Sequence, residues 1–133
     1  MKQYSNPSAK ENMGKKSIET EQIMHKFNSA FIHHNPAVLP ALIGKDCVME
    51  DITGPEGAKS VGYDECVTFW QALASDMEKQ FTPEAIEVYG EFATIRWHFK
   101  WGNGEHDYVR GVNLMKVQNG LIVEALGYAK MNN

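Results

Sequence analysis

Asp51 is the residue whose type and position best suit proton-transfer chemistry. It closes a short apolar run over residues 48–52, and a turn-forming stretch rich in glycine and proline, residues 53–57, follows at once. A carboxylate at the end of a strand is aimed at the mouth of whatever that strand lines. Burial there would raise its pKa and help it act as a general base near neutral pH. The simpler alternative is a carboxylate that caps the turn after the strand.

Asn113 is a second candidate for chemistry. It lies in the middle of an alternating segment, on the same face as Gly111 and Met115. That face is expected to point inward, where an amide can donate a hydrogen bond to a carbonyl oxygen without needing a shifted pKa. The alternative is a structural hydrogen bond to a neighbouring side chain, because a buried amide needs partners.

The helices that would position these groups are read from apolar spacing. Apolar residues between Ile23 and Phe31 recur at helical intervals, which predicts a helix from residue 17 to about 34. The polar residues 1–16 before it are expected to form a disordered tail. Asn35 caps and Pro36 opens a second short helix that is expected to end at Gly44. A third helix is predicted over 63–75, after a glycine-rich loop.

Alternation of apolar and polar residues predicts strands over 48–52, 81–89, 93–101, 108–117 and 121–129. The expected fold is a single α+β domain over residues 17–133. In it, three N-terminal helices pack on a strongly bent, mostly antiparallel β-sheet, and the resulting cone encloses a pocket. Inward side chains are expected either to line this pocket or to form plain core: Phe27, Phe31, Met49, Phe69, Trp70, Ile95, Trp97, Phe99, Val109, Gly111, Met115 and Gly127.

Composition argues against several classes of function. The chain has 133 residues and a formal net charge of −4 with interspersed signs, which argues against nucleic-acid binding. No apolar run approaches the roughly 20 residues that cross a bilayer, and no secretory signal pattern is present, so no membrane partner and a cytoplasmic location are expected. Cys47 and Cys66 are expected to be buried free thiols.

Neither a metal nor another cofactor is expected. The adjacent residues His33 and His34 point apart on a helix, although His34 continues its apolar face and is expected near the pocket rim. His98 and His106 flank a hairpin on the face opposite the aromatic side chains. None of these histidines is joined by a carboxylate in a ligand pattern.

From Met24 to about Phe69 the chain resembles the ketosteroid isomerases of the nuclear transport factor 2-like superfamily, which also contains SnoaL-like polyketide cyclases. The shared features are a helix, a second helix with an Asn or Asp cap, and an aspartate after a Met-Glu pair. Gly and Pro follow in the next loop, and Phe69 and Trp70 form an adjacent aromatic pair. The later hairpins align with single-residue gaps, so the resemblance covers most of the chain.

The resemblance implies roles for three positions. The aspartate that moves a proton between carbons of an enone falls on Asp51, and the late-strand acid that binds the enolate oxygen falls on Asn113. The tyrosine that donates to the same oxygen falls on Phe27, which has no hydrogen to donate. Because loss of one such donor typically costs about 10²–10³ in rate, a true steroid isomerase is not expected. The resemblance also implies a homodimer built on the outer sheet face.

Three functions stay open, and they differ on whether the protein is an enzyme. The first is an isomerase-like or cyclase-like enzyme in which Asp51 moves a proton on a small apolar carbonyl compound. The second is non-catalytic binding of a small apolar ligand, and the third is a protein-interaction domain. Limonene-epoxide-hydrolase-like chemistry is a weaker fourth option, because it needs an inward arginine and both Arg96 and Arg110 are predicted to face outward.

Overall fold

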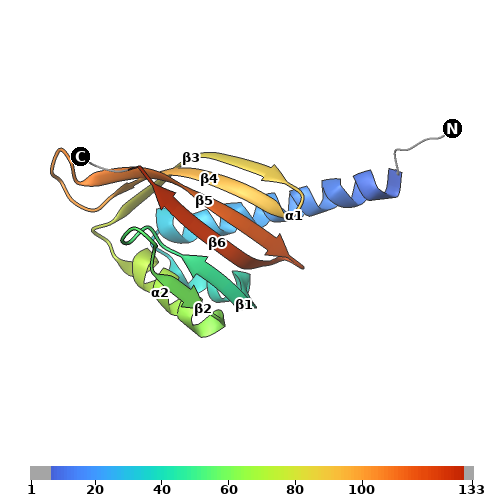
Figure 1. Ribbon diagram of the computed structural model, residues 1–133, viewed down its shortest axis with the longest axis horizontal. Coiled ribbons are helices and arrows are strands. Elements are labelled where there is room, and N and C mark those ends of the chain that lie inside the picture. The colour runs from blue at the N-terminus through green and yellow to red at the C-terminus, as the bar shows by residue number, and fades with distance from the viewer. Residues whose placement is uncertain (1–6, 131–133) are drawn as a thin grey trace.

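The computed structural model describes residues 7–130 and contains two α-helices, two 3₁₀ turns and one six-stranded sheet (Figure 1). The helices are α1 (Pro7–Ile32) and α2 (Tyr63–Ser75), and the 3₁₀ turns are η1 (Pro36–Val38) and η2 (Pro40–Leu42). The strands are β1 (Ile43–Glu50), β2 (Lys59–Val61), β3 (Gln80–Tyr89), β4 (Phe92–Lys100), β5 (Tyr108–Gln118) and β6 (Leu121–Ala129).

The strands lie in the order β2-β1-β6-β5-β4-β3. Every neighbouring pair is antiparallel except β1 and β6, which run parallel. Helix α1 packs mainly against β3, and α2 packs mainly against β1 (Figure 1). The α+β architecture with a mostly antiparallel sheet is therefore as predicted. The first strand of the sequence, β1, lies beside the last one, β6.

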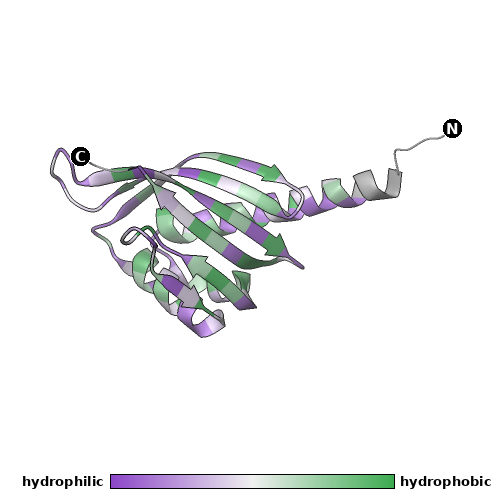
Figure 2. Cartoon of the chain, in the orientation of Figure 1, coloured by the Kyte–Doolittle hydropathy of each residue, from purple (hydrophilic) through white to green (hydrophobic). Residues whose placement is uncertain are grey.

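The core lies between the helices and the inner sheet face. Helix α1 contributes the periodic side chains that the sequence predicts, with Met24, Phe27 and Ala30 at most 2% exposed. Strands β3 to β6 alternate hydrophobic and hydrophilic residues (Figure 2). The C-terminal half of α1 spans the core.

Helix α1 begins at Pro7, ten residues before the predicted start at Ser17. Residues 7–16 are thus helical rather than part of a tail, and residues 1–6 lie outside the described part of the chain. Ser17 and Thr20 in this helix bind the β3–β4 turn. Thr20 Oγ1 donates to the carbonyl oxygen of Gly90 at 2.7 Å, and the Gly90 amide donates to Ser17 Oγ at 2.8 Å.

The prediction of three N-terminal helices is not confirmed. The helix predicted over 63–75 is present as α2, but the second short helix is replaced by η1 and η2. Leu39 and Leu42 each donate a backbone hydrogen bond three residues back, as in a 3₁₀ turn. Pro40 explains the interruption, because it lacks an amide hydrogen and its ring clashes with the carbonyl four residues earlier in an α-helix.

Some strand boundaries differ from the predicted ones, because hydrogen-bonded pairing between strands, rather than alternation along the sequence, sets where a strand begins and ends. Strand β1 spans Ile43–Glu50 instead of 48–52, so Asp51 lies just past its end, and β2 occupies part of the expected loop. In β6, Val117 pairs with Ile122 whereas Lys116 pairs with Glu124, which leaves Val123 as an extra residue. This bulge reverses the alternation of inward and outward side chains along β6, so Ile122 is buried in the core and its neighbours Leu121 and Val123 are not.

Candidate functional site

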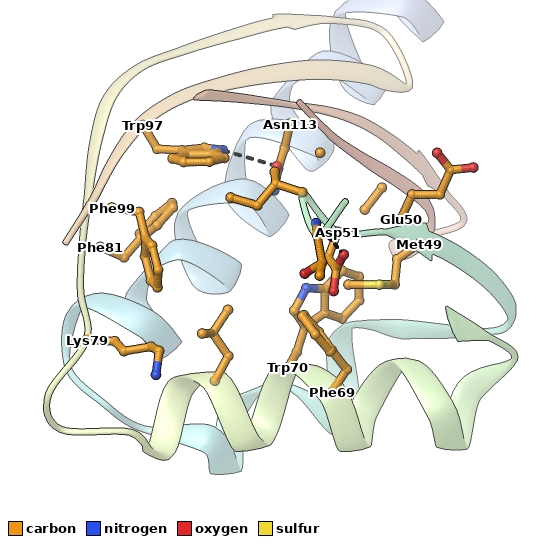
Figure 3. A pocket seen from close by; sticks show the side chains of 15 residues that line it. Met49, Glu50, Asp51, Phe69, Trp70, Lys79, Phe81, Trp97, Phe99 and Asn113 are labelled. Carbon is orange, nitrogen blue, oxygen red and sulfur yellow. Dashed lines mark hydrogen bonds between the residues drawn. The ribbon is translucent and has the colours of Figure 1, made fainter. Parts of the chain in front are cut away.

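A cavity of about 230 Å³ lies between α2 and the inner face of the sheet (Figure 3). Its walls are mostly apolar, and the polar atoms on them are few, which is the usual make-up of a small-molecule site. The lining residues are Met49, Glu50, Asp51, Ile52, Thr53, Phe69, Trp70, Leu73, Lys79, Phe81, Trp97, Phe99, Asn113, Ala125 and Gly127.

Asp51 lines the cavity and also holds the loop that follows β1. Its carboxylate oxygen Oδ1 accepts hydrogen bonds from the backbone amides of Thr53 at 2.8 Å and Ala58 at 2.9 Å. Its own amide donates to the carbonyl oxygen of Ala58 at 2.9 Å. The turn-capping role is therefore present in the structure. Oδ2 accepts no hydrogen bond within residues 7–130, so one carboxylate oxygen is left for the cavity.

Gly57 allows this loop to close tightly on Asp51. It adopts a φ of +73°, and a Cβ there would lie 2.6 Å from the carbonyl oxygen of Asp51. Only glycine meets both demands without strain. Gly57 and the two hydrogen bonds from backbone amides together fix the position of the Asp51 carboxylate, although the loop that carries it is largely exposed.

Asn113 presents its amide to the cavity from β5. Its Oδ1 accepts a hydrogen bond of 3.1 Å from Nε1 of Trp97 on the neighbouring strand (Figure 3). An indole nitrogen can only donate, so this bond assigns the oxygen of the amide to the Trp97 side. The amide nitrogen then remains as a donor. Asn113 thus makes the structural hydrogen bond that was the alternative to a role in the pocket. That bond uses only the amide oxygen, so the amide nitrogen can still donate.

Aromatic rings form much of the cavity wall. Phe69 and Trp70 extend from α2, and Phe81 and Phe99 stand opposite on β3 and β4 (Figure 3). Phe27 packs edge-on against Trp70 with ring centroids 5.0 Å apart, and it is only 2% exposed. Phe27 therefore supports the wall from behind and does not line the cavity.

Six of the twelve pocket residues predicted from the sequence line this cavity. They are Met49, Phe69, Trp70, Trp97, Phe99 and Gly127, and they surround both Asp51 and Asn113. Phe31, Ile95 and Met115 join Phe27 in the core instead. Gly111 lies against the ring of Trp97, and Val109 lines a neighbouring groove.

The cavity also has lining residues that sequence reasoning missed. Leu73 follows Trp70 by three positions on a helix, so its helical spacing was a usable signal. Phe81 begins a predicted strand and packs on Phe31 and Trp97 at 5.7 and 6.2 Å between ring centroids. Lys79, by contrast, lies between two elements, and no local pattern marks it. The other unpredicted members are Glu50, Ile52, Thr53 and Ala125.

Glu50 illustrates how a residue can border a cavity without serving it. Its side chain points away from the cavity in Figure 3, and its carboxylate is 3.9 Å from the Lys59 ammonium. Glu50 also borders a second hollow of about 560 Å³ on the far side of the 51–57 loop. The two hollows share Asp51, Ile52 and Gly127, so this loop is the partition between them.

The histidines are engaged elsewhere. Nδ1 of His34 lies 3.0 Å from the carbonyl oxygen of Ala74 and so joins the ends of α1 and α2; His34 does not line the cavity. His98 stacks on Tyr108 with centroids 4.7 Å apart. Among residues 7–130, no group of three or more His, Cys, Asp or Glu side chains is placed to hold a metal ion.

Cys47 and Cys66 are buried free thiols, as predicted, at the contact of β1 with α2. The Cys66 thiol donates to the carbonyl oxygens of Cys47 and Ser60 at 3.4 and 3.6 Å. Burial, together with the neighbouring Cys66, raises the pKa of the Cys47 thiol, and burial raises the pKa of the Cys66 thiol. Both groups are therefore neutral at physiological pH, which makes them poor nucleophiles.

The two arginines lie on the outer sheet face. Arg110 forms two hydrogen bonds with Glu84, at 3.0 and 2.9 Å, and Arg96 is 3.5 Å from Glu87. Both arginines thus pair with acids on another strand, and neither borders the cavity. None of the described helices is long and apolar enough to cross a membrane.

Comparison with known proteins places this geometry in context. The sequence profile of the SnoaL-like domain matches residues 24–125. An NTF2-like protein of unknown function from Mesorhizobium loti is 45% identical, with a TM-score of 0.82 over 87% of this chain and 94% of that one. No curated protein sequence matches the chain.

More distant solved structures share the fold. A putative ketosteroid isomerase from Kribbella flavida has a TM-score of 0.74 at 16% identity, over 88% of this chain and 82% of that one. A putative polyketide cyclase from Sinorhizobium meliloti has a TM-score of 0.66 at 21% identity, over 80% of this chain and 93% of that one.

Proposed function

Because the chain belongs to the SnoaL-like domain family of the NTF2-like superfamily, we propose that it is an enzyme that moves a proton on a small apolar carbonyl compound. Asp51 is the general base, and Asn113 donates a hydrogen bond to the carbonyl oxygen. The observation that carries this proposal is the Trp97–Asn113 hydrogen bond, which turns an amide donor toward the cavity that Asp51 also lines.

The proposed reaction follows from these two groups. The carboxylate of Asp51 removes a proton from a carbon next to the carbonyl, and the negative charge that develops moves onto the carbonyl oxygen. The amide of Asn113 stabilises that charge through a bond that strengthens as the enolate forms. The proton then returns to another carbon of the same system, so the product is an isomer. Apolar walls strengthen both interactions by excluding water.

The cavity volume limits the ligand. A cavity of roughly 150 Å³ holds benzene, and drug-sized ligands occupy roughly 300–1,000 Å³. At about 230 Å³ this cavity suits a compound of one or two rings. A four-ring steroid is a poor fit, in keeping with the absence of a hydroxyl donor at Phe27.

Hydrogen–deuterium exchange tests the proposal directly. In D₂O, wild-type protein is expected to accelerate deuterium incorporation next to the carbonyl of small cyclic ketones, as followed by proton NMR. Asp51→Asn is expected to abolish the acceleration, and Asn113→Leu to reduce it. Exchange that is the same with wild type and Asp51→Asn would refute Asp51 as the base.

A second candidate is ligand binding without catalysis. It is favoured by the two backbone amides that bind Oδ1 of Asp51, since a carboxylate with a structural task needs no catalytic one. In this case the same ketones stabilise wild type and Asp51→Asn equally and neither form promotes exchange.

We further propose that the outer sheet face forms a homodimer. This face carries large apolar side chains that are exposed to solvent: Phe92 is 55%, Leu114 44% and Tyr128 53% exposed. Sedimentation should give twice the monomer mass for wild type, and Leu114→Glu should shift the equilibrium to monomer. If wild type is a monomer with this apolar patch exposed, the hypothesis of a protein-interaction domain is favoured instead.

A further inference from the structure

Lys79 is the one basic residue that lines the cavity in the described part of the chain. It lies in the connection between α2 and β3, opposite the side of the cavity formed by Asp51 (Figure 3). Its side chain is 35% exposed, so it is partly shielded from bulk water. A charge in such a position acts on a ligand more strongly than one on the open surface does.

The ammonium of Lys79 is held in place before any ligand binds. Its Nζ donates to Oδ2 of Asp76 at 2.6 Å, and the other carboxylate oxygen, Oδ1, accepts the backbone amide of Glu78 at 3.0 Å. The bond from Lys79, followed by that from Glu78, lowers the pKa of the Asp76 carboxyl, so the pair stays charged at neutral pH. A tethered lysine loses less side-chain entropy when it binds a ligand.

The hydrogen bond to Asp76 does not use all the donors of the Lys79 ammonium. An ammonium carries three N–H donors and no acceptor, and Asp76 occupies one of them. The remaining donors can bind only an acceptor. Among acceptors, an anionic oxygen forms the strongest bond, because hydrogen bonds between two charged partners are roughly twice as strong as neutral ones.

We propose that Lys79 determines specificity by binding an anionic group, so that the ligand is a small ring compound with a ketone at one end and a carboxylate at the other. The ketone lies against the Asn113 amide, and the carboxylate lies against Lys79 at a separate part of the lining. This inference rests on the proposed function for the ketone end, and it names the substrate class for the same site.

Calorimetric titration with paired probes tests this assignment. The probes are a cyclohexenone carboxylic acid and its methyl ester, which share the ring and ketone and differ in charge. Wild type is expected to bind the acid roughly tenfold more tightly than the ester at low salt. Lys79→Met should bind both probes equally, and Lys79→Arg should keep most of the preference.

Lys59→Met is the matched control. Lys59 also pairs with a carboxylate, Glu50, at 3.9 Å, but it lies on β2 outside the cavity. This variant should keep the full preference for the acid. The preference of wild type should weaken as salt is raised, since mobile ions screen a partly exposed charge.

The outcomes separate this inference from the proposed catalysis. If wild type binds the ester as tightly as the acid, or if Lys79→Met keeps the preference, Lys79 has no such role, whatever Asp51 does. If the preference depends on Lys79 and no Asp51-dependent exchange is seen, Lys79 is supported and catalysis is refuted. If folded wild type binds neither probe, both are contradicted.

Discussion

The indole nitrogen of Trp97 donates a hydrogen bond to Oδ1 of Asn113 over 3.1 Å. Trp97 pairs in register with Gly111, two positions before Asn113 on β5, so its ring crosses the glycine to reach the amide. Because the indole can only donate, it determines which end of the amide faces away from it. One side chain thereby sets the orientation of a donor on another.

Trp97→Phe tests this orientation. The variant keeps an aromatic ring and removes the N–H, so the Asn113 amide is free to turn over. We expect ketone affinity to fall several-fold, with a loss of stability of about 0.5–1.5 kcal/mol for one hydrogen bond. Titration with a cyclic ketone and with the matching hydrocarbon measures the effect, and only the ketone should lose affinity. Equal loss for both ligands would show that the ring, and not the bond, is what matters.

Asp51 variants separate its two tasks. Asn keeps an Oδ1 acceptor for the amides of Thr53 and Ala58, whereas Ala loses both bonds. We therefore expect Asp51→Asn to fold nearly as stably as wild type, and Asp51→Ala to lose about 1–3 kcal/mol. Urea unfolding of the three proteins measures this ordering. Equal stability of the Ala and Asn variants would mean that the loop does not depend on the side chain.

Gly111→Ala is expected to damage stability and ligand binding together. A Cβ at this position would overlap the ring of Trp97 and the backbone carbonyl oxygen of Tyr128 on the paired strand. Neither group can retreat freely, so we expect a loss of about 1–3 kcal/mol and a displaced indole.

Gly14→Ala is the control for Gly111→Ala. Gly14 lies in α1, where an added Cβ meets no atom within 4 Å. Alanine there should stabilise the helix by about 0.5–1 kcal/mol. Urea unfolding of both variants should thus give opposite signs. A Gly111→Ala protein as stable as wild type, with unchanged ketone affinity, would contradict the packing described for Trp97.

The buried thiols predict a loss of stability at alkaline pH. Burial raises the pKa of the Cys47 thiol in the folded protein, whereas an unfolded thiol ionises near pH ~8.5. The neutral thiol therefore contributes stability that is complete below the unfolded pKa. That contribution is lost as the pH rises toward the folded pKa, by up to ~1.4 kcal/mol per pH unit for one fully shifted thiol.

Urea unfolding of wild type and Cys47→Ala between pH 7 and 10 measures this slope. Groups other than Cys66, whose pKa depends on its hydrogen bond with Cys47, titrate alike in both proteins, so the comparison reports on this pair of thiols. Wild type should lose its advantage over the variant as the pH rises. Parallel pH profiles for the two proteins would show that Cys47 has no shifted pKa in the fold.

Local sequence pattern was enough to predict much of the fold and part of the candidate site. Alternation along β4 and β5 determines that Trp97 and Asn113 both face inward, because the side-chain period of a strand is two wherever the pairing is regular. Helical spacing likewise determines that Phe69 and Trp70 meet the sheet. The turn residues after β1 determine that Asp51 stands at a chain reversal, since glycine and proline favour one.

The tertiary structure decided the rest, through contacts between distant parts of the chain. The bulge at Val123 depends on pairing with β5, and the burial of Phe27 behind Trp70 depends on how α1 meets α2. The place of Lys79 at the cavity depends on the path between α2 and β3. By itself the sequence determined which face each side chain takes, because that follows from local backbone geometry. Which atoms meet across those faces depends on strand register and loop paths, and these are settled only when the whole chain packs.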